Sequence, residues 1–162
     1  MTNPPLPIDT ADARPRQQDD EVSYEEAMAL AMTLHREGRL EAAAKVYDTL
    51  RRMNPKDPNP VHFLGVLQQS RGQTQAGLAL MRESVAMDPQ VPDWHNNLGN
   101  VLLESGRVDE AAAAYEEAAR LAPGRADIQN NLGVLRREQK RLDESEAAYR
   151  RAIALDPEVV DA

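Results

Sequence analysis

Three histidines are the side chains in this sequence that could most readily bind a metal or transfer a proton. They are His35, His62 and His95, and no two are spaced to place both rings on one turn of a helix. The chain has no cysteine, whereas a metal site needs three or four converging ligands. We therefore expect histidines on the surface, and neither a metal nor another cofactor.

Paired carboxylates are the other candidates for chemistry, because two acids can act as general acid and general base. Asp109-Glu110 and Glu116-Glu117 fall where helix starts or solvated helix faces are expected, and these positions account for them without catalysis. The sequence has no glycine-rich phosphate loop and no Gly-x-Ser-x-Gly nucleophile elbow. The sequence therefore predicts a protein that is not an enzyme.

Asparagines gather in the second half of the chain, at spacings that place them on one helix face. Asparagine is a poor helix former, so this concentration needs a reason. Side-chain amides both donate and accept hydrogen bonds, and a row of them could bind the backbone of an extended peptide. Alternatively, Asn97 and Asn131 stay solvated or bond within the protein, while Asn96 and Asn130 favour binding. The residues concerned are Asn96, Asn97, Asn100, Asn130 and Asn131.

Composition limits the classes of partner and compartment. The net charge is −8, whereas nucleic-acid binding normally requires a basic face, so we expect no nucleic-acid partner. No apolar run approaches the ~20 residues of a membrane span, so we expect no membrane partner. The N-terminal segment lacks the basic start and apolar stretch of a secretory signal. We therefore expect a cytoplasmic protein.

The elements that must position these side chains follow from a period of 34 residues. Prolines recur at this step and glycines keep it in a second column, so one structural unit is copied four times. A period of this length is diagnostic of stacked helical pairs. The two columns are Pro55, Pro89, Pro123 and Pro157, and Gly65, Gly99 and Gly133.

Each unit is expected to contain two amphipathic helices. After a disordered leader at 1–23, we place the units at 24–57, 58–91, 92–125 and 126–159, and interpret 160–162 as the start of a truncated or uncapped fifth unit. Glycine tolerates the left-handed backbone that closes a helix, and Gly38, Gly72 and Gly106 should separate the paired helices. Lys140 holds this position in the fourth unit, at a cost on the order of 1 kcal/mol.

Bulky residues in one column of the second helices are expected to fill the space between the paired helices. They are Tyr47, Tyr115 and Tyr149, with Met81 in the second unit. The second unit also has Gly77 inside a helix, at a cost of about 1 kcal/mol relative to alanine. Because Gln68 and Ser84 further replace apolar or small residues there, we expect the second unit to be the loosest.

The pattern across the third unit resembles the tetratricopeptide repeat. It comprises Trp94, Leu98-Gly99, Gly106, Ala111, Tyr115, Ala118 and Pro123, and the resemblance extends over 24–159. The resemblance implies an all-α, right-handed superhelical solenoid of four repeats and eight helices, whose first helices line a concave groove. The Asn-Asn-Leu-Gly runs at 96–99 and 130–133 are further similar to the repeats of O-linked N-acetylglucosamine transferases and their SPINDLY-type bacterial relatives.

The expected groove changes character along its length, from apolar side chains in the first two repeats to amides in the last two. We expect it to bind a protein or peptide ligand through Met28, Met32, His62, Phe63, Asn96, Asn97, Asn100, Asn130, Asn131 and Arg137.

Three functions fit this interpretation. The first is a protein–protein interaction module that binds an extended or helical segment in the groove. The second is the substrate-recognition arm of a glycosyltransferase whose catalytic domain is absent from the sequence. The third is a scaffold that associates with itself through an uncapped last repeat, where Leu135, Leu142 and Ile153 would be exposed.

Overall fold

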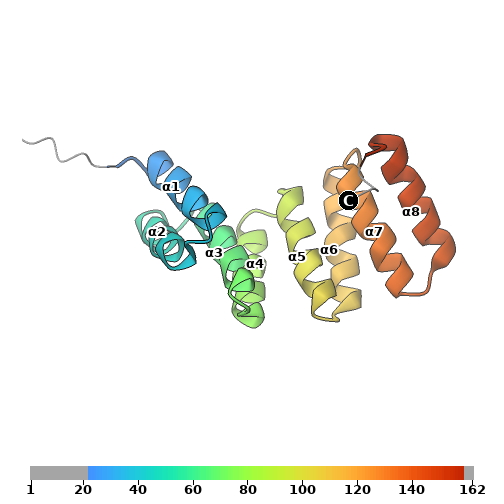
Figure 1. The fold of residues 1–162 in the computed structure, drawn as a ribbon, viewed down its shortest axis with the longest axis horizontal. Coiled ribbons are helices and arrows are strands. Elements are labelled where there is room, and N and C mark those ends of the chain that lie inside the picture. Colours follow the sequence, from blue (N-terminus) through green and yellow to red (C-terminus); the bar gives the residue numbers. More distant parts are fainter. Residues whose placement is uncertain (1–21, 159–162) are drawn as a thin grey trace, which may run out of the picture.

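The computed structural model describes residues 22–158, so most of the predicted leader and the start of a fifth repeat lie outside the described residues. The described part consists of helices without strands (Figure 1). The helices are α1 (Tyr24–Arg36), α2 (Leu40–Met53), α3 (Pro58–Ser70), α4 (Thr74–Met87), α5 (Pro92–Glu104), α6 (Val108–Leu121), α7 (Ala126–Glu138) and α8 (Leu142–Leu155).

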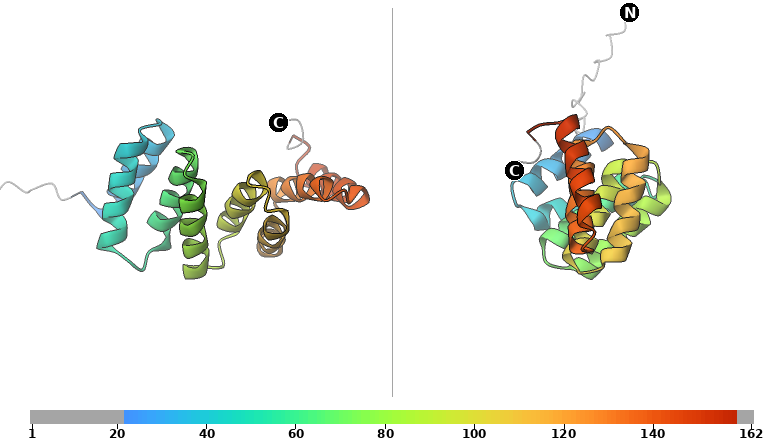
Figure 2. Two further views of the ribbon diagram at one scale, coloured as in Figure 1. Left: turned by 90° about the horizontal axis from the view of Figure 1, so that it is seen from below. Right: turned by 90° about the vertical axis from the view of Figure 1, so that its right-hand side faces the viewer.

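The helices form four antiparallel pairs that stack along one axis. The first helices of the pairs begin at Tyr24, Pro58, Pro92 and Ala126, and so keep the 34-residue period. Each period proline stands two residues after the last helical residue, where it cannot continue the helix. The pairs turn progressively along the axis (Figure 2). The predicted all-α superhelical solenoid of eight helices is confirmed.

The turns inside the pairs adopt the backbone that the sequence predicts. The φ angles are +73° at Gly38, +74° at Gly72 and +72° at Gly106. Lys140 has a φ of 60°, so a residue with a Cβ atom occupies the left-handed region in the fourth pair. The predicted strain at this position is therefore present in the backbone.

Glycines of the first helices make room for the bulky residues of the second helices. A Cβ atom on Gly99 would lie 2.6 Å from Cε1 of Tyr115, and one on Gly133 would lie 2.7 Å from Cδ1 of Tyr149. In the second pair, a Cβ atom on Gly65 would lie 2.9 Å from Cγ of Met81. The predicted packing of these side chains between paired helices is confirmed.

The expectation of a loose second pair is wrong, because Gly77 permits a close approach of two backbones. A Cβ atom on Gly77 would lie 2.9 Å from the carbonyl oxygen of Gly65 on α3. Ser84 is fully buried, and its hydroxyl donates to the carbonyl oxygen of Met81 at 2.8 Å. Gly77 therefore brings the backbones of α3 and α4 together, and the Ser84 hydroxyl adds a contact between them, 3.3 Å from Nδ1 of His62.

The last pair exposes part of the apolar surface that the sequence predicts. Leu142 and Ile153 are 66% and 45% exposed, but Leu135 is fully buried because it joins the cluster around Tyr115. Self-association through this pair stays a prediction. Within residues 22–158, no helix combines the length and apolar character needed to cross a membrane.

Candidate peptide-binding groove

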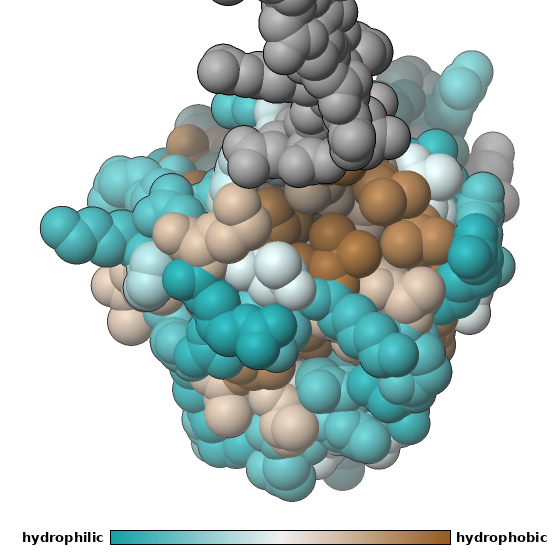
Figure 3. Space-filling view, turned by 90° about the vertical axis from the view of Figure 1, so that its left-hand side faces the viewer, coloured by the Kyte–Doolittle hydropathy of each residue, from teal (hydrophilic) through white to brown (hydrophobic). Residues whose placement is uncertain are grey.

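A groove of about 560 Å³ opens between α1 and the start of α3. It brings together Met28, Met32 and Phe63, three of the residues predicted to bind a ligand. A brown apolar area bordered by teal polar side chains is visible at this end of the molecule (Figure 3). The groove is lined by Tyr24, Glu25, Met28, Ala29, Met32, Asp57, Asn59 and Phe63.

Capping residues fix the two helices that form this groove. Ser23 and Glu26 form a capping box at the start of α1, in which each side chain accepts a hydrogen bond from the other's backbone N–H. Asp57 caps α3, where its Oδ1 accepts from the Asn59 N–H at 2.8 Å. Its Oδ2 accepts from the Tyr24 hydroxyl at 2.5 Å. This last bond ties the first turn of α1 to the cap of α3.

The hydrogen bond between Tyr24 and Asp57 also sets the charge at the edge of the groove. Burial and the neighbouring carboxylate raise the pKa of the Tyr24 hydroxyl, which stays a hydrogen-bond donor. Burial alone would raise the pKa of the Asp57 carboxyl, but hydrogen bonds from Tyr24 and Asn59 hold it below its usual range. Asp57 is therefore an anion at neutral pH.

The floor of the groove is apolar and supported from behind. The ring of Phe63 stacks on Tyr47 with centroids 5.7 Å apart and an interplanar angle of 12°. Met32 is 39% exposed and Met28 is partly buried. Methionine side chains are flexible and adapt to differently shaped partners. A rigid aromatic and two adaptable side chains can thus receive apolar groups of a ligand.

His62, predicted to line the groove, lies instead inside the stack and is 1% exposed. Its ring stacks on Trp94 with centroids 5.0 Å apart. Nε2 lies 3.2 Å from Nδ2 of Asn97, and Nδ1 lies 3.3 Å from Oγ of Ser84. An amide N–H can only donate, so the network assigns the lone pair to Nε2 and the proton to Nδ1.

Burial keeps this imidazole neutral. It lowers the pKa of His62 to about 4, although the charge of Asp93 acts in the opposite direction. His95 is also buried, and its Nε2 donates to the carbonyl oxygen of Pro89 at 2.9 Å. The expectation of surface histidines is thus wrong for two of the three, because both rings find hydrogen-bond partners inside the stack. Residues 22–158 hold no group of three or more potential metal ligands.

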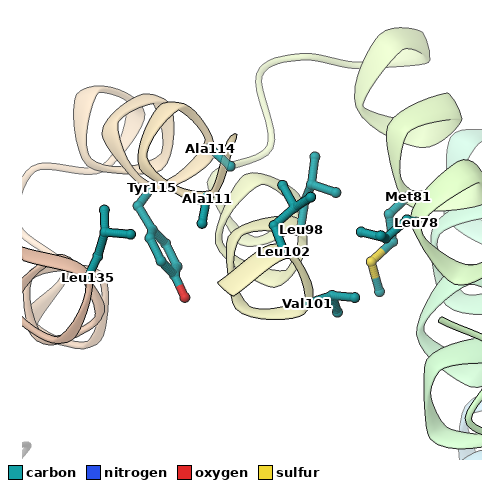
Figure 4. Packing of buried hydrophobic residues seen from close by; sticks show 9 residues of the cluster. All are labelled: Leu78, Met81, Leu98, Val101, Leu102, Ala111, Ala114, Tyr115 and Leu135. Atoms are coloured by element: carbon teal, nitrogen blue, oxygen red, sulfur yellow. The ribbon is translucent and has the colours of Figure 1, made fainter. Parts of the chain in front are cut away.

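Asparagines of α5 and α7 form a network between the third and fourth repeats. Nδ2 of Asn131 donates to Oδ1 of Asn96 at 2.9 Å and to Oδ1 of Asn100 at 3.2 Å. The Oδ1 of Asn100 also accepts from the hydroxyl of Tyr115 at 2.7 Å. The ring of Tyr115 belongs to the buried apolar cluster drawn in Figure 4. Bonding within the protein, one of the two alternatives for Asn97 and Asn131, is what the structure shows.

The remaining predicted residues lie apart from the groove between α1 and α3. Asn96 is 7% exposed and is held by Asn131, so a ligand cannot reach it as it could reach Met32. Asn130 is partly buried and Arg137 is exposed, both on α7. Binding of a peptide by the accessible residues of this set stays a prediction.

Sequence reasoning missed Tyr24 and Asp57 as members of the groove. Asp57 stands directly before Pro58, and aspartate followed by proline at the first helical position is a helix-start signal. That signal predicts a cap, and the cap of α3 lies beside the first turn of α1 because the two repeats are stacked. The sequence therefore contains the signal for the Asp57 cap, whereas the hydrogen bond between Asp57 and Tyr24 is seen only in the structure.

The chain belongs to the tetratricopeptide repeat family. The model of this family matches residues 17–58, 64–126 and 98–159, which together make up most of the chain. Such repeats are generally protein-interaction modules and are typically non-catalytic. No curated protein matches the chain, and nothing in these comparisons supports the narrower resemblance to the repeats of O-linked N-acetylglucosamine transferases.

Solved structures of two proteins illustrate the shared fold. A crystal structure of MamA aligns with a TM-score of 0.76 at 19% identity, covering 88% of this chain and 84% of MamA. MamA from Desulfovibrio magneticus RS-1 aligns with a TM-score of 0.76 at 22% identity, over 85% of this chain and 78% of that chain. PilF of Pseudomonas aeruginosa aligns with a TM-score of 0.78 at 21% identity, over 83% of this chain and 61% of that chain. At these identities, the likeness concerns the fold.

Proposed function

We propose that this protein is an interaction module that binds an extended or helical segment of another protein in the groove between α1 and α3. The observation that carries this proposal is the apolar floor of a groove of about 560 Å³, formed by the exposed Met32 and the partly buried Met28 and Phe63. A hollow that combines apolar side chains with a few polar groups is the usual form of a binding site. Membership of the tetratricopeptide repeat family supports the same function.

The amide-rich second half contributes to this function by holding the solenoid rigid. The side chain of Asn131 donates a hydrogen bond to Asn96, and that of Asn97 donates to His62. Satisfied polar networks rigidify the elements they join. A rigid stack presents the groove with little loss of conformational entropy on binding.

Peptides selected from a random display library against the whole chain test this function. Met32→Gln removes apolar contact from the groove, and we expect it to weaken the selected peptides by about tenfold. Met53→Gln is the matched control, because Met53 is an exposed methionine on α2 that does not line the groove. Equal affinity for the Met32→Gln variant and the native chain would show that the peptides bind elsewhere.

A further inference from the structure

The residue that precedes the first helix of each pair differs in charge between the two ends of the solenoid. The residue before the first helix of each pair is Ser23, Asp57, Val91 or Arg125. Arg125 in the fourth repeat donates to Asp127 at 2.6 Å and to Asp93 at 2.8 Å. It thereby neutralises acids at the start of α5 and α7. Asp57 places a carboxylate where Arg125 places a guanidinium.

The groove itself is acidic and has no basic side chain in its lining. Glu25 and Asp57 are its two charged residues, and neither lysine nor arginine occurs among the eight residues that line it. Both oxygens of Asp57 already accept hydrogen bonds, from Tyr24 and Asn59. A carboxylate has about four lone-pair sites, so these bonds leave capacity for a cationic donor from a ligand.

The acidic edge lies directly beside the apolar floor. Glu25 precedes Met28 and Ala29 by one helical turn on α1, so their side chains follow one another on one helix face. A ligand that inserts an apolar side chain over Met28 and Met32 therefore has its neighbouring residues next to Glu25 and Asp57. The net charge of −8 for the whole chain favours approach of a positively charged partner at long range.

We propose that the groove binds a basic amphipathic segment of a partner protein, in which leucine-like or aromatic side chains alternate with lysine or arginine. This inference rests on the proposed interaction function and adds the chemistry of the ligand. The apolar side chains of the segment contact Met28, Met32 and Phe63, and its cations lie against Glu25 and Asp57. Paired charges at the rim determine which segments associate, while apolar burial provides most of the affinity.

Two synthetic peptides of equal length test the charge preference, one alternating leucine with lysine and the other alternating leucine with glutamate. Binding to the whole chain is measured by fluorescence anisotropy at physiological salt. We expect the lysine peptide to bind at least about tenfold more tightly than the glutamate peptide. Equal binding of the two peptides, tighter binding of the glutamate peptide, or no binding of the lysine peptide at about 1 mM would overturn the inference.

A matched pair of variants separates the groove from general attraction to an acidic protein. Glu25→Lys and Asp109→Lys change the net charge equally, and both residues are exposed in the first turn of a helix. We expect Glu25→Lys to weaken the lysine peptide by about tenfold and Asp109→Lys to leave its affinity within about twofold. Equal weakening by both variants would assign the effect to net charge and contradict the inference.

The variant Met32→Gln distinguishes the failure of this inference from the failure of the proposed function. If Met32→Gln weakens both peptides equally while their affinities are the same, the groove binds peptides without regard to charge. The proposed function then stands and the basic preference falls. If Met32→Gln changes neither affinity, both the function and the preference are contradicted.

Discussion

One pair of positions recurs along the solenoid. It holds hydrogen-bonded polar side chains in the later repeats and apolar side chains at the N-terminal end. Residues 35 apart meet between neighbouring repeats: Asn131 donates to Asn96, and Asn97 donates to His62. The corresponding pair between the first two repeats is Phe63 and Met28, which line the groove instead. An amide pair satisfies itself, whereas the aromatic and methionine pair leaves apolar surface exposed. One backbone arrangement therefore gives a closed junction or an accessible apolar groove, depending on two side chains.

Acid should open the junction that contains His62 and spare the junction made of amides. Since burial lowers the pKa of His62 from 6.5 to about 4, the unfolded chain binds its proton at higher pH than the folded chain does. The contribution of the buried, neutral His62 to the free energy of unfolding is therefore fully present above pH 6.5. It is lost as the pH falls towards 4, by up to about 3 kcal/mol. The single tryptophan, Trp94, stacks on His62, so its fluorescence during urea unfolding measures this change.

Variants identify the histidine responsible. His62→Gln should flatten the pH dependence of the free energy of unfolding between pH 6.5 and 4, whatever its stability at pH 7. Burial also lowers the pKa of His35, so His35→Gln is the control and should remove a smaller share. The pKa values of the Glu26 and Asp127 carboxyls lie below their usual range, so these acids also lose their stabilising contribution as the pH falls, at the acid end of this window. Both variants retain these acids, so the difference between the variants reports the histidines. An unchanged slope in His62→Gln would contradict the assignment.

Removing the central donor should break the amide junction. In Asn131→Ala, Oδ1 of the buried Asn96 loses its donor, and Oδ1 of Asn100 keeps only Tyr115. Leaving a buried polar group unpaired costs about 1–3 kcal/mol, and we expect about 2 kcal/mol by urea denaturation. Asn130→Ala, at the partly buried neighbouring position, is the control and should cost less than about 0.5 kcal/mol. Equal losses for both variants would mean that the network adds no specific stability.

The glycine contact inside the second repeat should oppose helix propensity. Alanine is favoured over glycine in a helix by about 1 kcal/mol, yet a Cβ atom on Gly77 would lie 2.9 Å from the carbonyl oxygen of Gly65. Overpacking of this kind costs about 1–3 kcal/mol, so we expect Gly77→Ala to lower the free energy of unfolding by about 1 kcal/mol. Gly124→Ala, which meets no atom within 4 Å, should be neutral. A stabilised Gly77→Ala variant would restore the expectation of a loose second repeat.

The sequence predicted the repeating elements well because each repeat marks its own boundaries. Proline and glycine act on the local backbone, so their period gives the helices, the turns and the left-handed Lys140 directly. Residue type did not reveal how polar side chains are used. Asn97 and His62 are 35 residues apart and share a hydrogen bond, while Gly77 and Gly65 touch through backbone atoms. Such contacts depend on how two helices are placed, which periodicity alone does not determine.

The turn of the fourth pair should make the C-terminal end slightly less stable than the N-terminal end. The cause is Lys140 and not the junctions between repeats. Gly38, Gly72 and Gly106 close their helices at no steric cost, whereas Lys140 does so at a φ of 60°. Lys140→Gly relieves this strain, and we expect it to raise the free energy of unfolding by about 0.5–1 kcal/mol. Lys140→Ala removes the long side chain but keeps the Cβ atom, so it should show no such gain. A lower melting temperature for Lys140→Gly would contradict this expectation and mean that the left-handed turn tolerates lysine without strain. Any difference in stability between the two ends would then come from their junctions alone.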